Sequence, residues 1–171
     1  MKTKRMVFIV MALAIVFVFV SCAPGAEKTE VKEEMSEQKT RIVYTLDGEE
    51  VNLLDGERTY VKAWASWCSI CLSGLGELDE LAASDTDFRV LSVVAPNSPG
   101  EMSEEDFKEW WAGLDYENIE VLFDRDSEFF NEVGVRAFPT SVYIGSNGEY
   151  AKSVVGHNAN DFILETMNEI E

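Results

Sequence analysis

The sequence contains few of the cysteines and histidines that hold a structural zinc ion. Its 171 residues include three cysteines, Cys22, Cys68 and Cys71, and a single histidine, His157. A structural zinc site uses four ligands, usually two cysteine pairs or one pair with histidines. The chain offers too few ligands for such a site, and we expect it to hold no metal and no separate cofactor.

The sequence also lacks an apolar run typical of a membrane-spanning helix. Its longest run, residues 6–20, is shorter than the roughly 20 residues that such a helix needs. Three basic residues precede the run, and Ser21 and Cys22 follow it. A charged start, a short apolar core and a small residue before a cut are the layout of a secretory signal peptide.

Residues 19–22, Phe-Val-Ser-Cys, resemble a bacterial lipobox, in which the cysteine becomes the lipid-modified first residue after cleavage. We therefore predict a signal peptide at residues 1–21 and a lipid on Cys22, holding the protein on the extracytoplasmic face of the bacterial cell membrane. The alternative is an uncleaved membrane anchor with a free Cys22. Both place the domain outside the cytoplasm.

Basic residues are scarce, with 14 Lys and Arg against 32 Asp and Glu and a net charge of −18. Cleavage after residue 21 would remove three basic residues and bring the charge to −21. So acidic a protein is a poor ligand for nucleic acid. Residues 22–41 are rich in Glu, Lys, Thr and Ser and predict a lipidated, disordered tether. Residues 42–171 remain as one domain, which we expect to be a monomer.

The passage Trp67-Cys68-Ser69-Ile70-Cys71 carries the chemistry of the chain. A strand is predicted before it at residues 59–65, and apolar residues at helical spacing after it predict a helix that ends near Ser84. Cys68 would then lie at a helix N-terminus, where free N–H groups lower a thiol pKa. We expect its sulfur to be exposed and ionised and Cys71 to close a disulfide with it, so the pair predicts redox chemistry.

Two other interpretations of the cysteine pair stay open. A two-thiol copper site is one, because thiolates suit Cu(I). An inert structural disulfide is the other, since exported proteins contain such bonds. However, a two-residue loop closes too little chain for the bond to stabilise the fold much.

The remaining pattern predicts strands alternating with helices, which is typical of an α/β sandwich around a mixed sheet. The hairpin turn signals are Asp47-Gly48 and Asn147-Gly148. Ser103 is placed to begin a helix, and Gly134 to end one. The predicted strands are 42–46, 50–54, 59–65, 88–95, 119–123, 140–144 and 150–155. Besides the helix that contains the cysteine pair, the predicted helices are 103–114, 126–133 and 158–170.

The cysteine motif, Phe138-Pro139-Thr140 about seventy residues later, the second hairpin and the closing Gly156 with its helix occur together in order. In this combination the chain resembles the thioredoxin superfamily, and within it the membrane-tethered TlpA/ResA-like thiol–disulfide reductases. The helix and strand inserted at residues 103–123, ahead of Gly-Val-x-x-x-Pro-Thr at 134–140, are also similar to that group. The resemblance implies a thioredoxin-like fold with an N-terminal hairpin over residues 42–170.

The resemblance also implies roles for individual residues. Cys68 would be the nucleophile and Cys71 the resolving cysteine. Pro139 would be a cis-proline beside the two sulfurs, with Phe138 before it. Trp67 would offer an apolar surface to a client protein, although plain packing explains a tryptophan there nearly as well.

Three positions depart from the family pattern. Lys62 stands where thioredoxins carry a buried acid, Gly74 where ResA-like reductases carry an acid, and Gly76 where a helix-kinking proline is expected. Pointing inward, Lys62 would favour a thiolate; pointing outward, it would be a solvated charge. Glu77 is a candidate substitute for the missing acid or a plain surface residue, and we expect His157 on the surface without a catalytic task.

The resemblance implies a reductase that draws electrons from a membrane thiol conduit of the CcdA type. The clients we expect are a surface methionine sulfoxide reductase or apocytochrome c, the former favoured by the Ser-Ile dipeptide and the Leu-Ser-Gly-Leu that follows. The direction of electron flow depends on the reduction potential, which the dipeptide does not decide. A disulfide oxidase or isomerase, or a copper chaperone that uses the two thiols, is the alternative.

Overall fold

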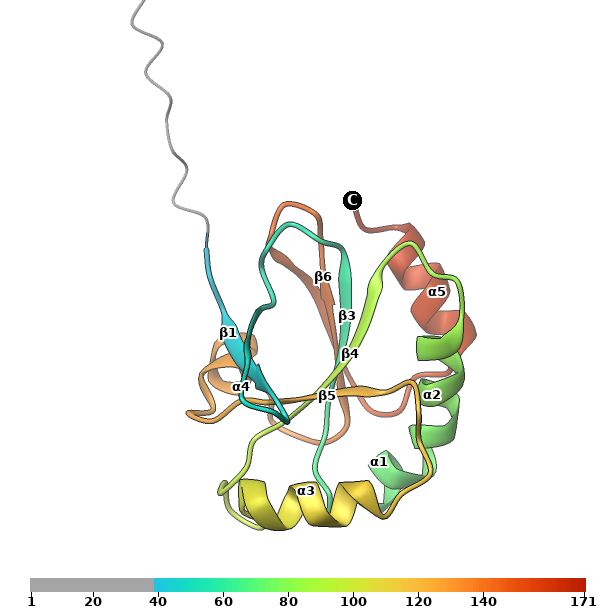
Figure 1. Cartoon of the computed structure of the whole chain (residues 1–171). Helices are drawn as coiled ribbons and strands as arrows, with labels where there is room; N and C mark the ends of the chain where they lie inside the picture. Colours follow the sequence, from blue (N-terminus) through green and yellow to red (C-terminus); the bar gives the residue numbers. More distant parts are fainter. Residues whose placement is uncertain (1–38) are drawn as a thin grey trace, which may run out of the picture. The chain divides into compact units, whose positions relative to one another are not determined.

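A mixed sheet of seven strands, in the order β2-β1-β5-β4-β3-β6-β7, carries the fold of residues 39–171, which the computed structural model describes (Figure 1). The contacts β3–β4 and β4–β5 are parallel and the others antiparallel. The strands are β1 Ile42–Thr45, β2 Glu50–Asn52, β3 Thr59–Ala63, β4 Arg89–Val94, β5 Glu120–Phe123, β6 Thr140–Ile144 and β7 Tyr150–Val155. The helices are α1 Ser69–Ser73, α2 Leu75–Ala83, α3 Glu104–Ala112, α4 Glu128–Val133 and α5 Asn160–Asn168.

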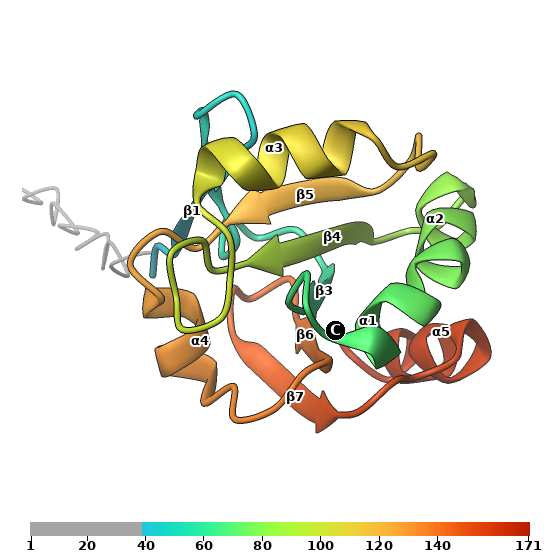
Figure 2. The ribbon, with the colours of Figure 1, turned by 90° about the horizontal axis from the view of Figure 1, so that it is seen from below.

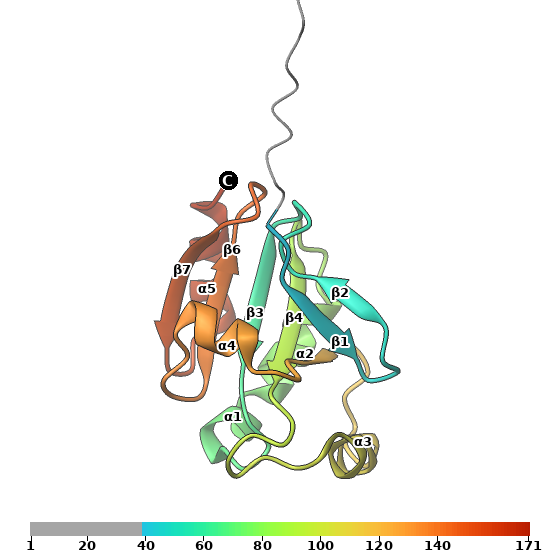
Figure 3. The same ribbon diagram turned by 90° about the vertical axis from the view of Figure 1, so that its left-hand side faces the viewer.

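The predicted thioredoxin-like fold is confirmed, including its N-terminal hairpin. β1 and β2 turn through Asp47-Gly48, where Gly48 has φ +92° and its N–H donates to the Thr45 carbonyl at 2.9 Å. β1 then pairs with β5, so the hairpin extends the sheet beyond the inserted strand (Figure 3). The predicted signal peptide, Cys22 and most of the predicted tether lie outside the described residues.

The two faces of the sheet bury separate apolar clusters. Tyr60 of β3 packs with residues of α1, α2, α3 and α5, whereas Val61 and Ala63 pack with Phe129 and Phe130 of α4. Figure 2 shows α4 on one side of the sheet and α1, α2 and α5 on the other. Every residue of β3 is buried, because this strand is covered on both faces and paired on both edges.

The prediction of one helix from the cysteine pair to Ser84 is wrong, since Gly74 divides it into α1 and α2. Gly74 has φ −98° and ψ 7°, and its N–H donates to the Cys71 and Leu72 carbonyls instead of continuing an α-helix. Glycine costs about 1 kcal/mol more than alanine within a helix, so a break there meets little resistance. The two helices can therefore take separate directions over the sheet.

The other predicted helices and turns are confirmed within one to three residues. The Ser103 side chain accepts a hydrogen bond from Asp106 N–H at the start of α3, and Gly134, with φ +69°, ends α4. α5 is shorter than predicted at both ends. No helix among residues 39–171 has the length and apolar character to cross a membrane.

The inserted helix α3 is fixed by an aromatic cluster, from which we predict a stability effect. Phe107 is fully buried against Trp64, Trp110, Trp111 and Phe123. Phe107→Ala should lower the free energy of unfolding in urea by about 3–5 kcal/mol, because it leaves a cavity. The control Phe162→Ala removes a ring that is 39% exposed and should cost about 1 kcal/mol or less. Equal losses in the two variants would contradict this assignment.

Candidate redox site

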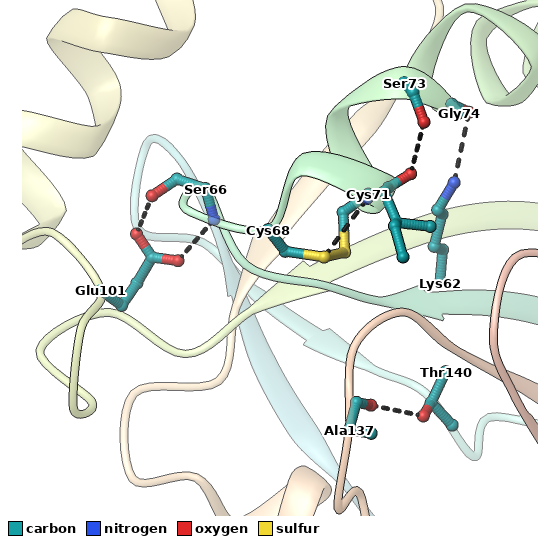
Figure 4. Close-up of a disulfide and its surroundings, with 10 residues drawn as sticks. Lys62, Ser66, Cys68, Cys71, Ser73, Gly74, Glu101, Ala137 and Thr140 are labelled. Carbon is teal, nitrogen blue, oxygen red and sulfur yellow. Dashed lines mark hydrogen bonds between the residues drawn. A yellow bond between two sulfur atoms is a disulfide. The ribbon is translucent and has the colours of Figure 1, made fainter.

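The two cysteines lie where the chain leaves β3 and enters α1, and they form a disulfide (Figure 4). Their Cα atoms are 5.2 Å apart. Cys68 is the N-cap of α1, and its Sγ accepts a hydrogen bond from Cys71 N–H at 3.2 Å. The predicted position of Cys68 at a helix N-terminus is confirmed, and in the reduced protein the same N–H groups would stabilise its thiolate.

The two cysteines differ in their access to solvent. Cys68 keeps 8% of its surface exposed and Cys71 none. The prediction of an exposed Cys68 is therefore wrong in degree, because its sulfur is bonded to Cys71 and accepts a hydrogen bond from Cys71 N–H. Cys68 is still the cysteine that another protein can reach, which fits it for the first attack and Cys71 for the second.

The loop with Pro139 lies at the same end of the sheet as the cysteines. β3 and β6 are antiparallel with Ala63 opposite Thr140, so the residue before Thr140 lies level with the residue after Ala63. The Phe138–Pro139 peptide bond is cis, as expected. Figure 4 shows Ala137, which precedes this bond, and Thr140, the first residue of β6 after it, on the side of the disulfide away from α1.

An exposed apolar surface borders the cysteines. Trp67 is 56% exposed and Ile70 58%. The Trp67 ring meets Phe138 edge-on with centroids 5.8 Å apart. A side chain at Gly100 would lie 3.2 Å from the Trp67 Nε1, so the 96–102 loop packs closely beneath the indole. Burial in the core thus does not explain Trp67; its role as a docking residue remains a prediction.

Lys62 points inward, which decides between the two expected orientations. Only 4% of the Lys62 surface is exposed, and the Lys62 Nζ donates to the Gly74 carbonyl at 3.2 Å. Burial lowers the pKa of Lys62 to about 8, and the nearby Glu77 carboxylate opposes this shift. His157 is on the surface as expected, but its Nε2 lies 3.1 Å from a Glu77 carboxylate oxygen.

Glu101 is a site residue that the sequence pattern did not indicate. Its carboxylate accepts hydrogen bonds from Ser66 N–H at 2.7 Å and from the Ser66 hydroxyl at 2.5 Å (Figure 4). It also accepts one from Met102 N–H at 2.8 Å. Ser66 lies two residues before Cys68 and is buried. The loop that leads into α3 therefore holds the loop that carries the nucleophile. Only the length of the loop between β4 and α3, rich in Pro, Gly and Ser, could have drawn attention to it.

The site contains two thiols and little else that a metal would bind. Among residues 39–171 no group of three or more His, Cys, Asp or Glu side chains is arranged to hold a metal ion. A disulfide at a helix N-terminus, one reachable sulfur and an adjacent cis-proline loop on this fold define a thiol–disulfide oxidoreductase.

The comparisons with known proteins agree. The Redoxin family model matches residues 23–168, and the chain belongs to this family. A solved structure, the exposed lipoprotein thioredoxin Etrx1 of Streptococcus pneumoniae, is 41% identical with a TM-score of 0.72, covering 77% of this chain and all of that one. Sporulation thiol-disulfide oxidoreductase A of Bacillus subtilis is 26% identical and covers 91% of this chain and 92% of its own length.

An uncharacterized Haemophilus influenzae protein is 45% identical over 103 residues, which are 60% of this chain and 66% of that protein, slightly under two thirds of its length. Several Bacillus relatives bear the name thiol-disulfide oxidoreductase ResA. The expected resemblance to ResA-like oxidoreductases is confirmed, and the chain is an oxidoreductase of this type.

The contacts of Glu101 predict its effect on the nucleophile. Glu101→Ala would leave the Ser66 and Met102 N–H groups without their acceptor, at a cost of about 1–3 kcal/mol in the free energy of unfolding. The loosened loop should slow alkylation of reduced Cys68 roughly fivefold at neutral pH, because a displaced Cys68 loses stabilisation of its thiolate at the N-terminus of α1, worth up to about 1 kcal/mol. Alkylation kinetics followed by mass spectrometry measure this effect. Glu105→Ala, on the exposed side of α3, is the control, and equal rates in the two variants would refute the role.

The burial of Lys62 predicts a pH-dependent stability. The unfolded chain holds this proton up to a pKa near 10.5, whereas the folded protein releases it near 8, so stability rises with pH between these values. Each pH unit contributes about 1.4 kcal/mol, so between pH 8 and 10.5 the free energy of unfolding of wild type should rise by about 3 kcal/mol relative to that of Lys62→Met. Urea unfolding at several pH values measures the difference. Lys152→Met, at an exposed position of β7, should give a flat difference, and a flat difference for Lys62→Met would contradict its burial.

Proposed function

We propose that this protein is an extracytoplasmic disulfide reductase, held on the membrane by a lipid on Cys22 and a tether over residues 22–41. The observation that carries the proposal is the asymmetry of the pair, with a reachable Cys68 at the start of α1 and a fully buried Cys71. A reachable nucleophile with a protected resolving thiol suits an enzyme that captures a partner disulfide and then releases the partner.

The membrane attachment is supported by the sequence and by one relative. Residues 19–22 resemble a lipobox, and the Streptococcus pneumoniae relative that is 41% identical is described as an exposed lipoprotein thioredoxin. A reductase outside the cytoplasm needs electrons from within the cell. We therefore propose a membrane thiol conduit of the CcdA type as the donor that reduces the Cys68–Cys71 disulfide.

The proposed client is a surface methionine sulfoxide reductase, whose catalytic cysteine ends each turnover in a disulfide. The exposed Trp67 and Ile70 and the edge of Phe138 give such a client an apolar surface beside Cys68. Apocytochrome c is the second candidate, because several relatives bear the name ResA and the resemblance to ResA-like reductases implies this client.

The reaction proceeds in two exchanges. The Cys68 thiolate attacks a sulfur of the client disulfide, which forms a mixed disulfide and releases one client thiolate that takes up a proton. Cys71 then loses its proton and attacks the Cys68 sulfur. The second client thiolate leaves and is protonated, so the client gains two electrons and Cys68–Cys71 becomes the disulfide. The membrane donor reverses this oxidation.

A trapping experiment tests the proposal. Cys71→Ser removes the resolving thiol, so the client should stay bound to Cys68 through a mixed disulfide. Expressed in its own cell from the full chain, this variant should yield an adduct with a methionine sulfoxide reductase, identified by mass spectrometry after nonreducing electrophoresis. The adduct should disappear with reductant. The double variant Cys68→Ser, Cys71→Ser is the matched control and should trap nothing.

Several outcomes would change the proposal. An adduct with apocytochrome c alone would replace the client. A reduction potential near about −120 mV, as in strong oxidants, would overturn the reductase direction. Stoichiometric Cu(I) binding without reduction of insulin disulfides would favour a copper chaperone. Fractionation adds the test of the tether: Cys22→Ser should leave the membrane fraction, and its retention there would indicate an uncleaved anchor.

A further inference from the structure

A buried lysine occupies the layer between the sheet and the cysteine helix. On β3, Lys62 follows Tyr60 by two residues, so the two side chains leave the strand on the same face, the face that also buries Cys71. Figure 4 shows the Lys62 side chain reaching from β3 to the end of α1, where Nζ donates to the Gly74 carbonyl. A long cation held in this layer requires an explanation, because burying a charge is costly.

Gly74 provides the room for this cation. A Cβ atom at this position would lie 2.7 Å from His157 Nδ1, closer than real Cβ atoms approach, and 3.0 Å from Lys62 Nζ, which is a tight contact. The absent side chain at the α1–α2 break is therefore filled from two other elements, β3 and the loop after β7. The two departures from the family pattern, a lysine at position 62 and a glycine at position 74, therefore belong together, because the Lys62 ammonium lies next to Gly74.

The charges around Lys62 form a chain that ends at the surface. Glu77 of α2 is the carboxylate that faces Lys62, and His157 contacts Glu77 from the other side. The pocket around Lys62 is also lined by Tyr60 of β3. The same apolar layer contains Tyr143 of β6 and, in the reduced protein, the thiols of Cys68 and Cys71. The remaining polar lining is neutral, from Asn158 and Asn160. Lys62 is thus the one cation held inward here within residues 39–171, with Glu77 as its counter-charge.

We propose that Lys62 is a positioning residue for the second exchange, in which its ammonium stabilises the thiolate of the buried Cys71. A fully buried thiol resists ionisation, because burial raises a thiol pKa. An ammonium in the same low-dielectric layer offsets this effect and supplies the attacking thiolate at neutral pH. Glu77 helps to keep Lys62 charged, and His157 holds Glu77. The inference concerns the thiol chemistry alone and depends on neither the client nor the direction proposed above.

The chemical step can be followed with an aromatic disulfide, DTNB. The Cys68 thiolate attacks DTNB, forms a mixed disulfide and releases one coloured thiolate. Cys71, ionised beside Lys62, then attacks the Cys68 sulfur, closes the Cys68–Cys71 disulfide and releases the second coloured thiolate. The protein dithiol loses two electrons and two protons, and DTNB accepts the two electrons as its disulfide bond breaks. The two releases report the two cysteines separately.

In stopped flow at about pH 7, Lys62→Met should slow the second release about tenfold, the change that one pKa unit in Cys71 produces. The first release should stay within about twofold, because Cys68 depends on the N-terminus of α1. Lys62→Arg keeps the positive charge and should restore most of the second rate. The advantage of wild type over Lys62→Met should fade as the pH rises above about 8, where Lys62 loses its proton.

A second measurement does not depend on resolving the two phases. In the double variant Cys22→Ser, Cys68→Ser, Cys71 is the one remaining thiol, so the ultraviolet absorbance of the thiolate reports its pKa. Adding Lys62→Met should raise that pKa by about one unit. Glu77→Gln should lower the pH at which the wild-type advantage fades, because it removes the counter-charge that keeps Lys62 protonated. An unchanged Cys71 pKa together with an unchanged second rate would overturn the proposal. A tenfold loss equal at every pH would also overturn it, because that would indicate a steric role.

Discussion

The pairing of β3 with both of its neighbours is the constraint on which the site depends. β3 lies between β4 and β6 and is buried on both faces. Its last residue, Ala63, is opposite Thr140, and this register brings the chain that continues to the cysteines beside the chain that arrives from Pro139. A slip of one residue would turn Lys62 and Trp64 to the other face, away from α1. The register therefore places the disulfide, the cis-proline loop and the buried lysine together.

The two ends of α1 stabilise charges of opposite sign. At the N-terminus, unpaired N–H groups face Cys68, and the Cys71 N–H already donates to its sulfur. At the other end, the Gly74 carbonyl accepts from the Lys62 ammonium. Anions at a helix start and cations at a helix end are both favourable. Gly74 leaves room for the second of these contacts, because a Cβ atom there would lie only 3.0 Å from Lys62 Nζ.

Much of this arrangement could be predicted because its signals are local. Asp47-Gly48 and Asn147-Gly148 mark turns, Ser103 begins α3, and the spacing of the two cysteines indicates redox chemistry. The orientation of Lys62 could not be predicted, since it depends on both faces of β3 being covered by elements distant in the sequence. For the same reason Glu101 escaped notice: its contact with Ser66 joins residues 35 apart. The side chains that pack against Gly74, Lys62 and His157, likewise come from two other elements.

The inserted segment between β4 and β5 has a second task beyond covering the sheet. Its helix α3 is fixed by the aromatic cluster of Trp64, Phe107, Trp110 and Trp111. Trp64 belongs to the segment that also carries Ser66 and Trp67, so α3 packs directly against this segment. The loop before α3 contacts the same segment twice more: Glu101 accepts a hydrogen bond from Ser66, and Gly100 packs against the Trp67 indole. Protein interiors are close-packed and transmit strain, so a segment held at three successive residues has little freedom to move independently of its neighbours. The exposed Trp67, the nucleophile beside it and the insertion are thus linked by direct contacts, and a protein that docked on Trp67 would touch a residue that packs against the loop supporting Cys68.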